Sequence, residues 1–193
     1  MNLEIIYITT YSYLLGSIPF GLILAKFFLN KDLRDIGSGN IGATNVFRTG
    51  KKSLAVFTLI LDSLKAYISI FITHIYFPNY IYLSALLCFL GHIYPVWLRF
   101  KGGKGIAVFL GVLFGLSIKF AILFIVCWSL ILYLTKYSSA SSLISTGVIF
   151  LYSIYLNNSF ESIFFFIMLI IVIYTHRANI VRLKDKTENK INF

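Results

Sequence analysis

Charged residues are scarce in this sequence. They make up 12% of its 193 residues, and only seven of them are Asp or Glu, whereas hydrophobic residues make up 59%. A soluble domain of this size needs more polar surface than that, because small domains have a high ratio of surface to volume. The composition therefore excludes a soluble globular protein and predicts that a lipid bilayer is the solvent for most of the chain.

Side chains that carry covalent or metal chemistry are also few. Cys88 and Cys127 each lie inside an apolar run, so we interpret them as small core residues and not as a disulfide or metal pair. His74, His92 and His176 are isolated, and none has an acidic residue four or five places further on. We therefore expect no histidine–aspartate dyad, no metal site and no cofactor. Any catalysis must depend on positioning and on electrostatic stabilisation.

Long apolar stretches are abundant and predict an all-α membrane protein. They lie at about 4–28, 53–77, 80–98, 105–135, 141–157 and 160–176. The fourth would make a helix of roughly 46 Å, which exceeds a hydrocarbon core of about 30 Å. We expect it to break at Leu116–Lys119, after Gly111 and Gly115, so that its first part has only about 12 residues. The prediction is a polytopic bundle of seven transmembrane helices in one domain, residues 1–193.

The basic residues predict the orientation of this bundle. With seven spans and the N-terminus outside, only Lys119 is left on the outer face. The cytoplasmic face then carries loops at about 29–52, 99–104 and 136–140 and the tail 177–193. Six spans would place Lys136 and the basic tail outside, against the positive-inside rule. The net charge of +10 thus has a topological explanation, and we expect no nucleic-acid binding.

Two of these cytoplasmic loops are rich in glycine: GSGNIGATN at 37–45 and KGGKG at 101–105. Glycines let backbone N–H groups converge without side chains in the way, and such groups beside a cation bind phosphate or carboxylate. The nearby side-chain donors are Ser38, Asn40, Arg48, Lys104, Ser139 and Asn179. A single glycine-rich loop of this kind could be an ordinary turn whose lysines only set the membrane topology. Two such loops on the same membrane face favour a binding site for an anion.

Nucleotide-binding motifs are excluded by their context. GSGNIG matches G-x-G-x-x-G, but it follows a membrane helix and no βαβ unit is available. GGKG is not a P-loop, because Gly105 follows Lys104 where Ser or Thr is required. We therefore expect no nucleotide partner.

One ionisable pair lies within the second apolar stretch. Asp62 and Lys65 are three residues apart, so they share a helix face. Ionisable groups at that depth are costly and often functional. They could equally neutralise each other inside the bundle, and the sequence leaves both explanations open.

The motifs together resemble the membrane-embedded bacterial acyl-phosphate:glycerol-3-phosphate acyltransferases, the PlsY family. The resemblance runs nearly end to end through GSIPFGLILAK, DLRDIGSGNIGATNVFRTGKK, LDSLK, GHIYPVWLRFKGGKGIA, TKYSSASSLIS and HRANIVRL, with Glu188 after the last. It implies transfer of a fatty acyl group from acyl phosphate to the 1-hydroxyl of glycerol 3-phosphate, which yields lysophosphatidate and phosphate. It also implies seven helices, an outside N-terminus and the bacterial cytoplasmic (inner) membrane.

The resemblance also implies roles for individual residues. Ser38 and Asn40, with the turn at Gly102 and Gly103, would hold the acyl phosphate and polarise its carbonyl. Arg48 and Lys104 would bind phosphate, that of glycerol 3-phosphate above all. The remaining substrate-binding positions are Gly39, Asn45, Gly105, Ser139, Ser142, His176, Asn179 and Glu188, the last three closing over glycerol 3-phosphate. The sequence departs from the family where Val108 replaces a usual Thr.

Two other functions would also suit parts of this sequence. A small-anion membrane transporter would also suit basic pockets and short helices, but transporters commonly have paired repeats and a site at the midplane. No internal repeat is visible here, and the polar residues crowd one face. A non-catalytic interaction protein would have little use for two glycine-rich anion loops.

Overall fold

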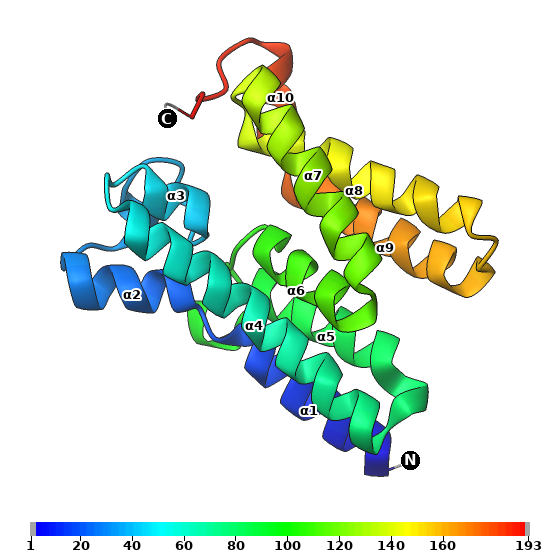
Figure 1. Ribbon diagram of the computed structural model, residues 1–193. Helices are drawn as coiled ribbons and strands as arrows, with labels where there is room; N and C mark the ends of the chain where they lie inside the picture. Colours follow the sequence, from blue (N-terminus) through cyan, green and yellow to red (C-terminus); the bar gives the residue numbers. More distant parts are fainter. Residues whose placement is uncertain (1–2, 192–193) are drawn as a thin grey trace. The chain divides into compact units, whose positions relative to one another are not determined.

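The computed structural model describes residues 3–191, and within them all regular secondary structure is helical (Figure 1). The chain divides into two compact units, Met1–Ser117 and Ile118–Phe193. The first contains α1 (Leu3–Ser17), α2 (Phe20–Leu29), α3 (Ala43–Phe47), α4 (Lys52–Tyr76), α5 (Ile81–Ile93) and α6 (Ile106–Leu116), with short 3₁₀ turns at Leu33–Asp35, Pro78–Tyr80 and Val96–Leu98. The second contains α7 (Ile118–Thr135), α8 (Ser138–Tyr155), α9 (Ser159–Thr175) and α10 (Arg177–Lys184).

The first unit is held together by close helix pairs. α1 packs along α5, and α4 packs along α6. A Cβ atom on Gly16 would lie 2.0 Å from the carbonyl oxygen of Cys88, and one on Gly111 would lie 1.9 Å from that of Ser63. The absent side chains let the helix backbones touch, as is common between helices in a membrane.

Pro19 separates α1 from α2. Proline has no N–H to continue the helix and disfavours helical geometry in the residue before it. α1 therefore ends at Ser17, and α2 begins at Phe20. The carbonyl of Ile18, inside this break, is bonded by a side chain of α4, as described below.

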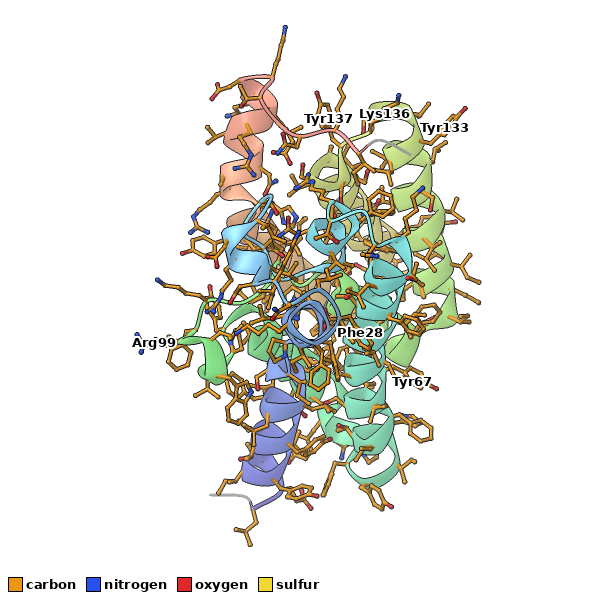
Figure 2. All side chains as sticks on the ribbon, turned by 90° about the vertical axis from the view of Figure 1, so that its left-hand side faces the viewer. Phe28, Tyr67, Arg99, Tyr133, Lys136 and Tyr137 are labelled. Carbon is orange, nitrogen blue, oxygen red and sulfur yellow. The ribbon has the colours of Figure 1, made fainter. Side chains whose placement is uncertain are left out.

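The second unit has an aromatic core. The ring of Phe120 in α7 lies 4.9 Å from that of Phe165 in α9 and 5.6 Å from that of Tyr152 in α8, measured between centroids. Outside this core, the Tyr133 side chain extends away from α7 and is 76% exposed (Figure 2). Large exposed hydrophobic side chains are frequent on both units, which suits helices that face lipid.

The predicted all-helical membrane protein is confirmed. By length and composition, four segments can cross a membrane: Leu3–Leu29, Lys52–Tyr76, Pro78–Leu98 and Ile118–Thr135. The pair of α9 and α10, bent by 62°, would be a fifth. The expected break of the long apolar stretch is also found, because α6 ends at Leu116 and α7 begins at Ile118. Every predicted apolar stretch contains a helix, whereas the number of crossings and the side of each terminus stay predictions.

Candidate active site

The predicted site residues are divided between the two units. In the first unit, Asn45 forms the centre of the first glycine-rich loop and is buried. Its Nδ2 lies 3.0 Å from the carbonyl oxygens of Leu33 and Ile36 and 2.8 Å from that of Asn40, while its Oδ1 accepts a hydrogen bond of 2.9 Å from the backbone N–H of Ser38. The Asn45 carboxamide is thus fully used within the loop. Asn45 thus shapes the loop in the structure, and its predicted contact with substrate stays a prediction.

Left-handed glycines let the loop wrap around this side chain. Gly37 and Gly39 have φ angles of 57° and 68°, which favour glycine. A Cβ on Gly37 would also lie 2.3 Å from Asn45 Oδ1. The wrapped loop leaves Ser38 exposed, so the Ser38 hydroxyl can meet a substrate.

Asn40 and Arg48 lie at the ends of this loop. The Oδ1 atom of Asn40 accepts from the backbone N–H of Gly42 over 2.9 Å, so its amide nitrogen is the group it can offer to a carbonyl oxygen. Arg48 follows α3, and its Cδ lies 3.8 Å from the Cβ position of Gly37. Its side chain therefore runs beside the loop and brings a guanidinium group to it.

The second glycine-rich loop is tied to the end of α5. The backbone N–H of Gly102 donates to the carbonyl of Ile93 and that of Gly103 to the carbonyl of His92, each over 3.0 Å. These carbonyls belong to the last turn of a helix, where they have no partner within the helix. The two amides therefore complete α5. That the Gly102–Gly103 turn holds acyl phosphate stays a prediction.

The turn places Lys104 and Gly105 directly before α6. Gly105 is buried, has a φ of 87° and precedes the first residue of the helix. A Cβ there would lie 2.3 Å from Cε2 of Phe89 in α5. Among residues 3–191, no side chain caps this helix end. The first N–H groups of α6 and the ammonium group of Lys104 thus favour an anion at the same place.

Residues of both loop regions pack into the same apolar cluster. Leu33, Ile41 and Val46 around the first loop are buried together with residues of α2 and α4. Leu98, just before the second loop, packs against this cluster. Both loops are therefore positioned by the same packing.

Behind the second loop lies a buried polar cluster formed by Asp62, Lys65 and His92. Lys65 Nζ is 2.7 Å from Asp62 Oδ1 and 3.0 Å from His92 Nδ1, and it also donates to the carbonyl of Ile18 over 2.7 Å. The three side chains are at most 4% exposed. His92 was not among the predicted site residues.

In the second unit, the predicted residues Ser139 and Asn179 come together at the carboxylate of Glu188, which was also predicted. Glu188 Oε1 accepts from Ser139 Oγ over 2.9 Å and from Asn179 Nδ2 over 2.6 Å, and Oε2 accepts from Arg182 Nε over 2.7 Å. Partial burial acts to raise the pKa of Glu188, but the hydrogen bonds from Arg182, Asn179 and Ser139 outweigh it and lower the pKa. Glu188 is therefore ionised and orients the three donors.

The end of the chain holds Glu188 in this position. The backbone N–H of Ile191 donates to the carbonyl of Lys136 over 2.8 Å, and the Ile191 side chain is buried. Lys190 Nζ lies 5.6 Å from the centroid of the Tyr137 ring. Lys136 and Tyr137 form the turn between α7 and α8, as Figure 2 shows. The tail thus folds back onto this turn.

Ser142 and His176 are fixed by neighbouring groups. Ser142 Oγ donates to the carbonyl of Ser138 over 2.8 Å and accepts from Trp128 Nε1 over 3.2 Å. The hydroxyl of Ser142 thus already has both a donor and an acceptor. His176 Nδ1 lies 2.9 Å from the carbonyl oxygen of Val172, which only accepts, so Nδ1 carries a hydrogen. In the neutral ring, His176 Nε2 is then an acceptor.

Comparison with known proteins identifies the family. The family model described as glycerol-3-phosphate acyltransferase matches residues 6–186. The chain belongs to the glycerol-3-phosphate acyltransferase family. A glycerol-3-phosphate acyltransferase of Pelagibacter ubique is 50% identical over 97% of this chain and 98% of its own, and one of Ehrlichia canis is 50% identical over 93% and 95%.

Solved structures agree with this family. The glycerol 3-phosphate form of PlsY, an integral membrane glycerol 3-phosphate acyltransferase, has a TM-score of 0.92 and 36% identity, covering 98% of this chain and 96% of its own. The lysophosphatidic acid form has a TM-score of 0.89 and 35% identity, with the same coverage. The predicted resemblance and the acyltransferase function are therefore confirmed, in preference to an anion transporter.

Two members of the polar clusters were not predicted: His92, which contacts Lys65, and Arg182, which contacts Glu188. His92 is 27 residues from Lys65, and no spacing rule joins residues on different helices. Arg182 was counted only as a topogenic charge, although Glu188 lies six residues further on. The run of basic and acidic residues from Arg182 to Glu188 was the available signal for this second pair.

Proposed function

We propose that this protein transfers a fatty acyl group from acyl phosphate to the 1-hydroxyl of glycerol 3-phosphate, the first acylation step of phospholipid biosynthesis in the bacterial cytoplasmic (inner) membrane. The observation that carries the proposal is similarity over 98% of the chain to an acyltransferase crystallised in a glycerol 3-phosphate form and in a lysophosphatidic acid form. Those two compounds are the acceptor and the product of one acyl transfer. Acyl phosphate is already an activated donor, so the reaction requires no cofactor or metal.

The proposed reaction takes place directly between the two substrates, and no side chain of the protein acts as a nucleophile. The 1-hydroxyl oxygen of glycerol 3-phosphate bonds to the carbonyl carbon of acyl phosphate, and the bond from that carbon to the phosphate oxygen breaks. The hydroxyl proton passes to a phosphate oxygen of the substrates, so the products are lysophosphatidate and inorganic phosphate. The protein contributes positioning and stabilisation of the negative charge that develops on the carbonyl oxygen.

The first unit supplies the groups for the acyl phosphate carbonyl and for phosphate. Ser38 Oγ and the amide nitrogen of Asn40 polarise the carbonyl, from a loop whose shape depends on Asn45. Arg48 and Lys104 bind phosphate, with Lys104 at the N-terminus of α6, where the helix dipole also favours an anion. Gly39, Gly102, Gly103 and Gly105 act indirectly, through the geometry of the two loops.

For the glycerol moiety we assign Ser139, Asn179, His176 and Glu188, as the family resemblance implies. Ionised Glu188 orients Ser139 and Asn179, because it accepts a hydrogen bond from each of them. Ser142 supports this region through its bonds to Trp128 and Ser138.

We further infer seven crossings, with the N-terminus outside and the C-terminus in the cytoplasm. The first apolar segment of the sequence contains the two helices α1 and α2, and each of the other six contains one α-helix. Most basic residues then fall in cytoplasmic segments, as the positive-inside rule requires. α6, with 11 residues, is too short to cross alone and must be shielded by the protein or by a thinned membrane.

The test of this function uses the purified protein in detergent or lipid. Palmitoyl phosphate is supplied with and without glycerol 3-phosphate, and both inorganic phosphate and extracted lipid are measured. We expect phosphate release that requires glycerol 3-phosphate and equals the lysophosphatidate formed. Phosphate release that is independent of glycerol 3-phosphate, or no lipid product from folded protein, would contradict the proposal.

A further inference from the structure

We propose that Asp62, Lys65 and His92 form a buried clamp that positions Lys104 by fixing the turn before it. The clamp residues are positioning residues, since none is assigned to contact substrate. The proposal rests on the proposed function in one respect, that Lys104 binds a substrate phosphate. It gives Asp62 and Lys65 of α4 a specific role, whereas the sequence alone could not decide whether the pair is functional or only neutralises itself inside the bundle.

Lys65 is the centre of the clamp. Its ammonium group has three N–H donors, and three acceptors surround it: Asp62 Oδ1 at 2.7 Å, the Ile18 carbonyl at 2.7 Å and His92 Nδ1 at 3.0 Å. The Phe20 ring lies over the same nitrogen, 5.7 Å from its centroid. A buried charge is tolerated when it is paired and its hydrogen bonds are made. Lys65 thereby joins α4 to α5 and to the break between α1 and α2.

The bond from Lys65 determines which nitrogen of His92 carries the hydrogen. An ammonium group can only donate, so His92 Nδ1 must accept, and the neutral ring carries its hydrogen on Nε2. The hydrogen bond from Lys65 to Nδ1 also keeps the ring from rotating. His92 therefore presents one defined edge to its other neighbour.

That other neighbour is Gly103. A Cβ atom on Gly103 would lie 2.1 Å from His92 Nε2 and 2.9 Å from Cδ2 and Cε1, so only glycine fits against the ring. The backbone of the same residues is joined as well, since Gly103 N–H donates to the His92 carbonyl. His92 thus fixes Gly103 through both its ring and its backbone.

Lys104 is held between two such fixed points. On one side, Gly103 rests on His92, and on the other, buried Gly105 packs against Phe89 of the same helix, α5. With both neighbours anchored on α5, the backbone of Lys104 has little freedom, and its side chain leaves the turn in one direction. A displaced turn would move the ammonium group relative to the phosphate that it binds.

We expect the clamp to affect substrate binding more than the chemical step. Misplacement of a phosphate-binding cation by about 1 Å can cost roughly 10- to 100-fold in catalytic efficiency. The loss should fall mainly on the KM for glycerol 3-phosphate, with a smaller change in kcat, since the clamp does not touch the reacting atoms. A purely structural cluster would lower the amount of folded protein and leave the KM of the remainder unchanged.

The test enlarges the side chain at residue 103, makes the side chain at residue 92 smaller, and then combines the two changes. Gly103→Ala places a methyl group against the ring and should raise the KM for glycerol 3-phosphate about tenfold or more. His92→Asn keeps an acceptor near the position of Nδ1 for Lys65 but removes the ring edge that faces Gly103. The double variant should therefore recover a KM within a few-fold of His92→Asn alone, because the methyl group now has room. His74→Asn, the same change at an exposed site on α4, serves as the matched control.

Each outcome decides the proposal. A high KM in Gly103→Ala that falls in the double variant supports the clamp. A KM equal to that of wild type in Gly103→Ala, or loss of folded protein in both single variants without recovery in the double variant, would overturn it. An unchanged KM for glycerol 3-phosphate in Lys104→Ala would instead show that the assigned phosphate contact is wrong, and a wild-type protein without lysophosphatidate product would show that the proposed function is wrong.

Discussion

The two glycine-rich loops of the first unit are held in contrasting ways. The loop at 37–45 is organised from within, because one neutral side chain, Asn45, bonds to backbone groups no more than 12 residues away. The loop at 101–105 is organised from outside, by the end of α5 and by a charged cluster from α4. The polar bonds that shape the first loop are thus local, whereas those that shape the second come from neighbouring helices.

The largest loss of stability should follow from breaking the external support of the second loop. Lys65→Met leaves Asp62 as an unpaired buried charge, and we expect a loss of about 3–5 kcal/mol in the free energy of unfolding. The double variant Lys65→Met with Asp62→Leu removes both charges and should recover much of this loss. Thermal unfolding in detergent measures both. Equal stability of the single and double variants would contradict a paired buried charge.

Breaking the internal support of the first loop should have a smaller effect on stability. Asn45→Ala removes the shared donor of three carbonyl groups and the acceptor of the Ser38 N–H, which should cost about 2–3 kcal/mol. Activity should fall with it, since Ser38 and Asn40 lose their geometry. Asn79→Ala, at an exposed position, is the matched control for thermal unfolding and turnover. A stable but inactive Asn45→Ala would point to direct substrate contact instead.

The carboxylate cluster of the second unit allows a test through pH, and its effect should be the smallest. The pKa of Glu188 is lowered in the folded protein, so its stabilising contribution is present above the unfolded pKa and is lost as pH falls through the folded pKa. At neutral pH, Glu188→Gln should cost about 1–3 kcal/mol, because charge-assisted hydrogen bonds are lost. The difference in Tm between wild type and variant should shrink as the pH is lowered below about 4. A difference that is constant with pH would contradict an ionised Glu188.

The contrast between the loops also explains what the sequence could predict. Hydropathy predicted the helices and the break before Ile118, since burial in lipid depends on composition over many residues. Glycines and donors close together in the sequence predicted both loops. Spacing could not show that the Gly102 and Gly103 amides point to α5, because that depends on where the helix ends relative to the turn. For the same reason, spacing could not connect His92 with Lys65, because helix packing brings them together.

The most direct test of the account compares Lys104→Ala with Lys101→Ala. Both remove a lysine from the same loop, but only Lys104 stands at the start of α6 between the anchored glycines, and Lys101 is exposed. With palmitoyl phosphate and glycerol 3-phosphate as substrates, Lys104→Ala should lower kcat/KM at least about 100-fold in folded protein, while Lys101→Ala stays within a few-fold of wild type. Equal activity of the two variants would contradict a phosphate site at Lys104.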